Sequence, residues 1–142
     1  MRSLLDVNVL VALLDADHSL HRPAMSWFAD NASHGWASCP ITQNGCVRVM
    51  SHAGYPNAPG LSLIAARLGD AVASDVHEFW ADDLSLLDAR LFDRSRIHGP
   101  RQITDSYLLA LAVRHHGRLV TFDAGISLAA VRGAQVHNLL RL

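Results

Sequence analysis

Residues 1–15, MRSLLDVNVLVALLD, run a short apolar segment into an aspartate and then directly into a longer apolar segment. The first part, SLL at 3–5, predicts a buried strand, and VNVLVALLD at 7–15 predicts a helix that is apolar on nearly every side. Asp6 stands at the junction, and Asp123 follows the strand that RLVTF predicts at 118–122. A carboxylate at the end of a buried strand costs free energy unless something holds it, so both positions require a partner.

The composition is that of a globular protein, and we expect a single domain spanning residues 1–142. Hydrophobic residues make up 50% of the chain and charged residues 18%. The formal net charge of −1 gives no overall positive potential that would attract nucleic acid. Any surface that binds nucleic acid must therefore be a local basic patch. All 12 basic residues are arginine, and the absence of lysine excludes every mechanism that needs one.

The cysteines and the N-terminus predict the cellular setting. Cys39 and Cys46 are too few for a disulfide scaffold and lack the paired spacing of a zinc site. The N-terminus carries no basic targeting segment, and its longest apolar run, residues 7–14, is far shorter than the roughly 20 residues that cross a bilayer. We therefore expect a cytoplasmic protein with no membrane association.

Predicted strands alternate with predicted helices along the chain. We expect strands at 3–5, 35–39, 77–81, 118–122 and 135–140, and helices at 7–15, 21–32, 41–52, 61–72, 104–117 and 127–131. The mixed, basic residues 86–102 predict a short helix followed by a loop. This alternation is typical of an α/β fold with a mostly parallel sheet that is covered on both faces. Ligands of such sheets bind at the carboxyl ends of the strands, where Asp6 and Asp123 are expected.

Three aspartates are candidate metal ligands. Each has an ordinary structural explanation, since Asp6 can cap a helix, Asp105 can favour the dipole of the helix at 104–117, and Asp123 can make a turn. The topology nevertheless brings all three to one edge of the sheet, where three unpaired carboxylates cannot all stay ionised cheaply. Mg²⁺ or Mn²⁺ takes carboxylate ligands and keeps several waters, which leaves room for a phosphate. The set therefore predicts metal-dependent hydrolysis of a phosphodiester.

Residues near these aspartates are candidates for orienting them or for binding substrate. Asn8 could hydrogen-bond a metal ligand or cap its helix, and Thr104 could touch phosphate or cap its own helix. Arginine side chains are good phosphate ligands, and a run of them precedes Asp105. The candidates for a backbone-binding patch are Arg90, Arg94, Arg96 and Arg101, with Arg48 next. A solvated loop explains the same run equally well.

Four stretches together resemble a known family over nearly the whole chain. They are LLDVNVLVALL (4–14), CPITQNGCVRV (39–49), HEFWADDLSLLD (77–88) and RQITDSYLLALAVRHHGRLVTFDAG (101–125). In this order they are similar to the PIN-domain ribonuclease toxins of bacterial toxin–antitoxin pairs, the VapC family. The resemblance implies a three-layer α/β/α domain and Mg²⁺- or Mn²⁺-dependent cleavage of RNA, often tRNA. It also implies a homodimer, inhibition by a cognate VapB antitoxin, and Asp6, Asp105 and Asp123 as the acidic residues.

Gln43 departs from the family pattern, because a glutamate commonly completes the acidic cluster at this position. A glutamine carbonyl can still ligate a hard cation or hold a water, but it carries no charge and cannot act as a base. Gln43 is therefore kept as a candidate catalytic residue. The alternative is a weakened PIN-like module that binds RNA or a partner without cutting it.

Three other classes of protein fit less well. A signalling receiver domain needs a lysine, and a haloacid-dehalogenase-type phosphatase expects a second aspartate where DVN at 6–8 has none. A dinucleotide-binding domain would need a G-x-G-x-x-G motif, which none of the 9 glycines forms. The apolar surface of the helix predicted at 61–72 is wider than packing against one core requires. This favours a contact between that surface and a second subunit or an antitoxin.

Overall fold

The computed structural model describes all residues, 1–142, and contains one five-stranded sheet in the order β3-β2-β1-β4-β5. Every pair of neighbouring strands is parallel. The strands are β1 (Ser3–Leu5), β2 (Trp36–Ser38), β3 (His77–Phe79), β4 (Arg118–Thr121) and β5 (Leu139–Arg141). The central position of β1 places its carboxyl end between those of β2 and β4, so the residues after these three strands are neighbours.

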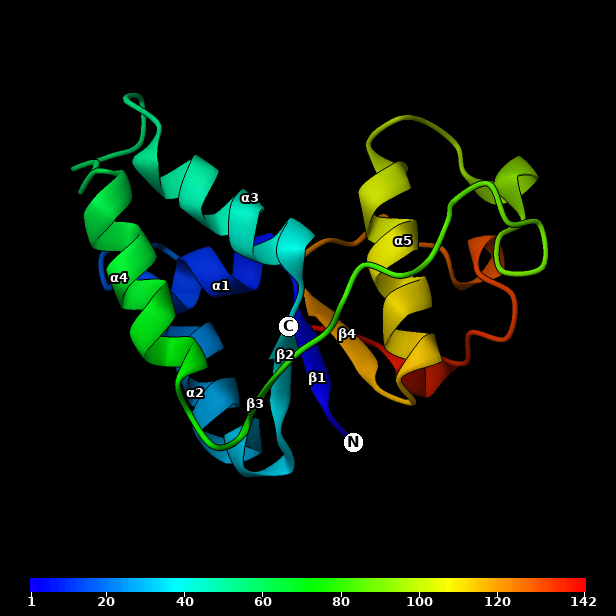
Figure 1. The fold of residues 1–142 in the computed structure, drawn as a ribbon, viewed down its shortest axis with the longest axis horizontal. Helices are drawn as coiled ribbons and strands as arrows, with labels where there is room; N and C mark the ends of the chain where they lie inside the picture. Colours follow the sequence, from blue (N-terminus) through cyan, green and yellow to red (C-terminus); the bar gives the residue numbers. More distant parts are fainter.

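Helices cover both faces of the sheet, which makes three layers (Figure 1). One side carries α1 (Val7–Leu14), α2 (His21–Asn31), α3 (Pro40–Ser51) and α4 (Leu61–Val72), and the other carries α5 (Gln102–Arg114). Side chains alternate across a strand, so Leu5 packs into the core under α1 and α3 while Leu4 packs into the core under α5. The predicted parallel sheet with two covered faces is confirmed.

Helix α3 approaches α1 closely at Gly45. A Cβ atom added there would lie 2.5 Å from Cγ2 of Val7, which is closer than carbon atoms can pack. Glycine therefore lets α3 lie directly against the start of α1. This contact fixes the position of α3, the helix that carries Gln43, against the turn that follows Asp6.

Three predictions for irregular segments are wrong. The strand expected at 135–140 begins only at Leu139, because the residues before it form the 3₁₀ helix η4 (Val136–Asn138). There Asn138 Oδ1 accepts a hydrogen bond from the Gln135 amide at 2.9 Å, a local bond that competes with strand pairing. The helix expected at 127–131 is only the 3₁₀ turn η3 (Leu128–Ala130). The only helical residues within 86–102 are those of the 3₁₀ turn η2 (Arg94–Arg96) and the first residue of α5.

The remaining elements occur where the sequence predicts them, and the helix at 61–72 matches α4 at both ends. None of the helices has the length and apolar character that spanning a bilayer would demand.

Candidate active site

Asp6 is held by the backbone on one side and by β4 on the other. It is the N-cap of α1 and only 6% exposed. Its Oδ1 accepts a hydrogen bond from the Val7 amide at 2.7 Å, and its Oδ2 accepts one from the Thr121 hydroxyl at 2.6 Å. Burial raises the pKa of Asp6, the two hydrogen bonds lower it, and the charge of Asp123 raises it further. The partner that a carboxylate at this strand end requires is therefore Thr121, together with the helix start.

Thr121 links both ends of the acidic cluster. While its hydroxyl donates to Asp6, its oxygen accepts from the Asn8 side-chain amide at 3.2 Å and from the Asp123 backbone amide at 3.0 Å. Asn8 Oδ1 in turn accepts from the Phe122 amide at 3.2 Å. These bonds tie the start of α1 to the end of β4 and orient Asp6. Asn8 thus makes the supporting contact that its position two residues after Asp6 suggests, and its contact with substrate stays a prediction.

Asp105 lies in the first turn of α5, and its side chain makes no hydrogen bond within the chain. Its pKa is raised from 3.8 to about 6. The largest cause is burial, and the charges of Asp6 and Asp123 add to it. Because each of these carboxylates disfavours ionisation of Asp105, the three share one electrostatic neighbourhood.

Asp123 is exposed, in the loop that follows β4. Its Oδ1 accepts a hydrogen bond from the Gly125 amide at 2.8 Å, so it makes the expected turn as well as joining the cluster. No arginine pairs with Asp6, Asp105 or Asp123. The ion pairs of the chain lie elsewhere and join Arg2 to Glu78, Arg90 to Asp88, and Arg114 to Asp83.

The donor set fits a hard divalent cation. All three side chains offer carboxylate oxygens, and no basic side chain balances their charge. No group of three His, Cys, Asp or Glu side chains is close enough in this structure to hold a metal ion by itself. The chemistry of these side chains suits a cation, and the metal-ligand roles of Asp6, Asp105 and Asp123 stay a prediction.

Gln43 bonds to β2 and is connected through it to β3. Its Nε2 donates to the Ser38 hydroxyl oxygen at 2.9 Å, and that hydroxyl also bonds to His77 Nε2 at 2.8 Å. Burial is the main reason that the pKa of His77 is lowered, which favours a neutral imidazole in this chain of bonds. Gln43 also lines a hollow between α3 and α4 with Leu68 and Val72. Sequence reasoning missed Ser38 and His77, because only the pairing of β2 with β3 brings them together.

The arginine candidates divide into engaged and free side chains. Arg90 pairs with Asp88, and Arg94 donates to the Leu87 carbonyl at 2.9 Å. Arg96 and Arg101 are exposed and make no ion pair. Of these two, Arg101 is directly at the start of α5, four residues before Asp105, where Thr104 is also exposed.

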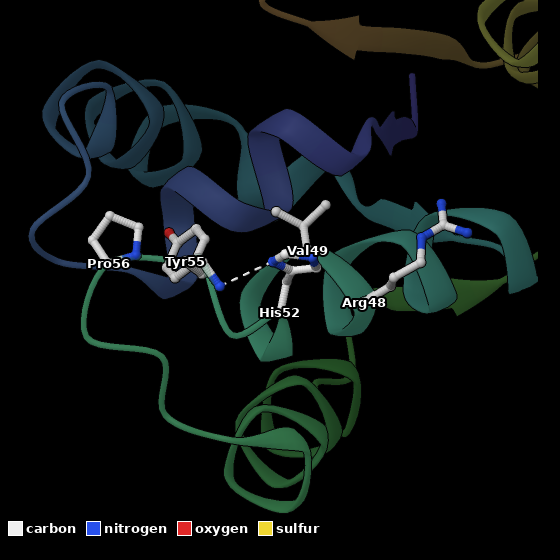
Figure 2. A pocket seen from close by; sticks show the side chains of 6 residues that line it. Arg48, Val49, His52, Tyr55 and Pro56 are labelled. Carbon is white, nitrogen blue, oxygen red and sulfur yellow. Dashed lines mark hydrogen bonds between the residues drawn. The ribbon is translucent and has the colours of Figure 1, made fainter.

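Arg48 lies on the outer face of α3, away from the arginine-rich segment. It lines a shallow cavity of about 420 Å³ with Val49, His52, Tyr55 and Pro56. Figure 2 shows its guanidinium pointing away from Tyr55 and Pro56. Arg48 is therefore an exposed cation on the helix that also carries Gln43.

One side chain that sequence reasoning did not single out connects two loops at this edge. Gln102, the first residue of α5, accepts from the His98 amide at 2.8 Å and donates to the Gly125 carbonyl at 3.1 Å. The only signal in the sequence is a glutamine three residues before Asp105, which lies on the same face of a helix.

This fold and acidic edge define a class of nuclease domain, and comparison with known proteins identifies it. Residues 3–132 match the PIN-domain family, so the chain belongs to that family. It is 52% identical to Ribonuclease VapC44 of Mycobacterium tuberculosis over 142 residues, 100% of both chains. It is 42% identical to Ribonuclease VapC39 of the same organism over 134 residues, 94% of this chain and 96% of the relative. Within the PIN-domain family, the protein is thus a member of the VapC ribonuclease toxins.

Two solved structures share the fold. Mycobacterium tuberculosis VapC20, described as a Sarcin-Ricin loop cleaving toxin, has a TM-score of 0.63 at 13% identity and covers 91% of this chain and 98% of its own. The structure of VapBC2 from Rickettsia felis, bound to a DNA fragment from its promoter, has a TM-score of 0.59 at 15% identity. The match covers 87% of this chain and 89% of the chain in that structure. The three-layer α/β/α PIN fold is confirmed. PIN-domain ribonucleases generally use divalent metal ions, in accord with the donor set here.

Proposed function

We propose that this protein is an endoribonuclease that needs Mg²⁺ or Mn²⁺ and acts as the toxin of a type II toxin–antitoxin pair. The observation that carries the proposal is the cluster of Asp6, Asp105 and Asp123. These carboxylates repel one another and have no basic partner. Asp6 follows β1, Asp105 lies in the first turn of α5, and Asp123 lies in the loop after β4. Asp6, Asp105 and Asp123 would hold the cation.

Each residue of the site has a distinct task in the reaction. A cation held by the three aspartates would supply neutralising charge at the scissile phosphate and would lower the pKa of a water bound to it. Thr121 orients Asp6 through its short hydrogen bond, and Asn8 orients Thr121. Asp105 has no hydrogen-bond partner of its own, so its oxygens are available to a cation or to a water. Gln43 can offer only a neutral carbonyl.

The substrate we propose is tRNA or another structured RNA. The exposed guanidinium groups of Arg96 and Arg101 stand before the helix that carries Asp105, where they can bind backbone phosphates on either side of the scissile bond. Thr104 is exposed beside them, and Arg48 offers a further phosphate contact on α3. The description of VapC20 as a Sarcin-Ricin loop cleaving toxin is in accord with an RNA substrate.

We also propose three properties of its biological setting. A VapB-type antitoxin would bind and inhibit the protein, as the VapBC2 complex suggests. A homodimer would cover exposed apolar residues of α4 such as Leu61 and Leu63, which are 63% and 46% exposed. The protein would act in the cytoplasm, where its RNA substrate is found.

The test is cleavage of mixed cellular RNA by the purified protein. We expect cleavage with Mg²⁺ or Mn²⁺, none with chelator, and none by an Asp105→Asn variant. Asp70→Asn is the matched control, because Asp70 is an exposed aspartate on α4. Cleavage that survives the chelator, or survives Asp105→Asn, would refute the proposal.

The same experiment separates the enzyme from the second candidate, a module that binds RNA or a partner without cutting it. That candidate is favoured by one observation, the engagement of the Gln43 amide by Ser38. RNA binding without any cleavage across Mg²⁺ and Mn²⁺ concentrations would select it.

A further inference from the structure

We propose that Gln102 is a positioning residue that sets the separation of Asp105 and Asp123 by bonding the first turn of α5 to the loop after β4. The inference rests on the proposed function, because it concerns two of the residues proposed to hold the cation. Gln102 itself would contact neither the substrate nor the cation.

The first step is the pair of hydrogen bonds that Gln102 makes with backbone groups. Its Oε1 accepts from the His98 amide at 2.8 Å and its Nε2 donates to the Gly125 carbonyl at 3.1 Å. A backbone amide can only donate and a carbonyl can only accept, so both bonds require a side chain that carries an acceptor and a donor. Glutamine meets this requirement with enough reach.

The second step leads from Gly125 to Asp123. The Gly125 amide donates to Asp123 Oδ1 at 2.8 Å, while the Gly125 carbonyl accepts from Gln102. The Asp123 amide is held on its other side by the Thr121 hydroxyl at 3.0 Å. Asp123 is exposed and lies in a loop, so these contacts are what restrict its carboxylate. Thr121 ties it to β4, and Gln102 ties it to α5.

The third step leads from Gln102 to Asp105. The two residues are three positions apart in α5 and therefore lie on one face of the helix. The bond from Gln102 to Gly125 thus joins the helix turn that carries Asp105 to the loop that carries Asp123. These two carboxylates come from different elements, and no hydrogen bond joins their side chains to each other. A cation that needs oxygens from both depends on the spacing that Gln102 maintains.

The bond to His98 extends this arrangement to the basic segment. His98 follows Arg96 by two residues and precedes Arg101 by three. Gln102 therefore holds the segment that carries the proposed phosphate-binding arginines against the same helix turn. Loss of the side chain should loosen both loops at once, while the helix itself keeps its backbone hydrogen bonds.

The experiment compares the wild-type protein with Gln102→Met, which has similar length and neither polar group. Mn²⁺ binding is measured without RNA, from the electron paramagnetic resonance signal of free Mn²⁺. We expect three- to tenfold weaker binding, about what the loss of one or two partly exposed hydrogen bonds gives. Cleavage should need correspondingly more Mn²⁺ and should return to near the wild-type rate at saturation.

Two further variants make the result specific. Gln102→Asn keeps the polar groups but is too short to span both loops, so it should weaken Mn²⁺ binding as Gln102→Met does. Gln135→Met is the matched control, because Gln135 is an exposed glutamine before η4, and Mn²⁺ binding should not change. Thermal unfolding in chelator should change by less than about 3 °C in all three variants, since Gln102 is half-buried and its substitution creates no cavity.

The outcomes separate the two proposals. Unchanged Mn²⁺ binding in Gln102→Met and Gln102→Asn overturns the positioning role, as does a lower saturating rate with unchanged Mn²⁺ binding. A wild-type protein that binds no Mn²⁺ overturns the proposed function and the positioning role together. Weaker binding in both Gln102 variants, with a normal control and a recovered rate, supports the inference.

Discussion

Replacing Asp105 by asparagine should stabilise the metal-free protein, although the same change should abolish cleavage. The pKa of Asp105 is raised from 3.8 to about 6, because burial and the charges of Asp6 and Asp123 disfavour its ionised form. One pKa unit corresponds to about 1.4 kcal/mol, so the full shift would cost the folded state about 3 kcal/mol at neutral pH. Solvent screening of a partly exposed group reduces this cost to about 1–2 kcal/mol.

Asparagine removes this cost but also loses a favourable interaction with the helix dipole, worth about 0.5 kcal/mol. The net gain of about 1 kcal/mol should raise Tm by about 4 °C in a chain of this size. The measurement is thermal unfolding in chelator at pH 7.5, with Asp70→Asn as the exposed control. Added Mn²⁺ should raise the Tm of the wild-type protein and reverse the order of stability.

The stability difference should also depend on pH. The folded-state pKa of Asp105 is above the unfolded value, so the folded protein binds the proton more tightly and wild-type stability falls as pH rises from about 3.8 to about 6. The gain from Asp105→Asn should therefore be smaller at pH 4.5 than at pH 7.5. An equal or lower Tm for the variant at pH 7.5 would refute this reasoning. A difference in Tm between variant and wild type that is the same at both pH values would also refute it.

Three other changes test the remaining parts of the site. Gln43→Glu adds a carboxylate and should lower the Mn²⁺ concentration needed for cleavage about tenfold; overlapping titration curves would place Gln43 outside the site. Thr121→Val removes the donor to Asp6 and should destabilise the protein by about 1–3 kcal/mol in urea unfolding, whereas Thr121→Ser should restore most of the loss. The double variant Arg96→Ala and Arg101→Ala should raise KM for RNA. The slope of log KM against log salt concentration should fall by the amount expected for about two lost phosphate contacts, and an unchanged slope would count against the arginine patch.

The sequence predicts the fold where hydrophobic periodicity is strong. The apolar repeat at 61–72 has the bounds of α4, and the apolar run after Asp6 becomes α1. Periodicity says little where local side chains bond to the backbone. Residues 135–138 carry apolar and polar residues in a pattern that suits a strand, yet the Asn138 side chain closes a 3₁₀ turn there.

In the candidate site, the positions of the acidic residues could be predicted from the sequence, but their hydrogen-bond partners could not. The positions of Asp6, Asp105 and Asp123 at strand ends and a helix start follow from topology, because parallel strands bring their carboxyl ends to one edge. The contacts that hold them join residues far apart in the chain, as Thr121 does with Asp6 and Gln102 with Gly125. Such partners depend on strand register and loop conformation, which no local pattern in one sequence specifies.

The central position of β1 has a consequence for synthesis on the ribosome. β1 emerges first, yet one of its two neighbours in the sheet, β4, is translated only near the end of the chain. Asp6 must wait for Thr121 to orient it, and Asp123 lies just beyond. A nascent chain therefore cannot bring its acidic residues together before β4 has been synthesised. If the proposed active site is correct, the order of translation would keep this ribonuclease inactive until its synthesis is almost complete.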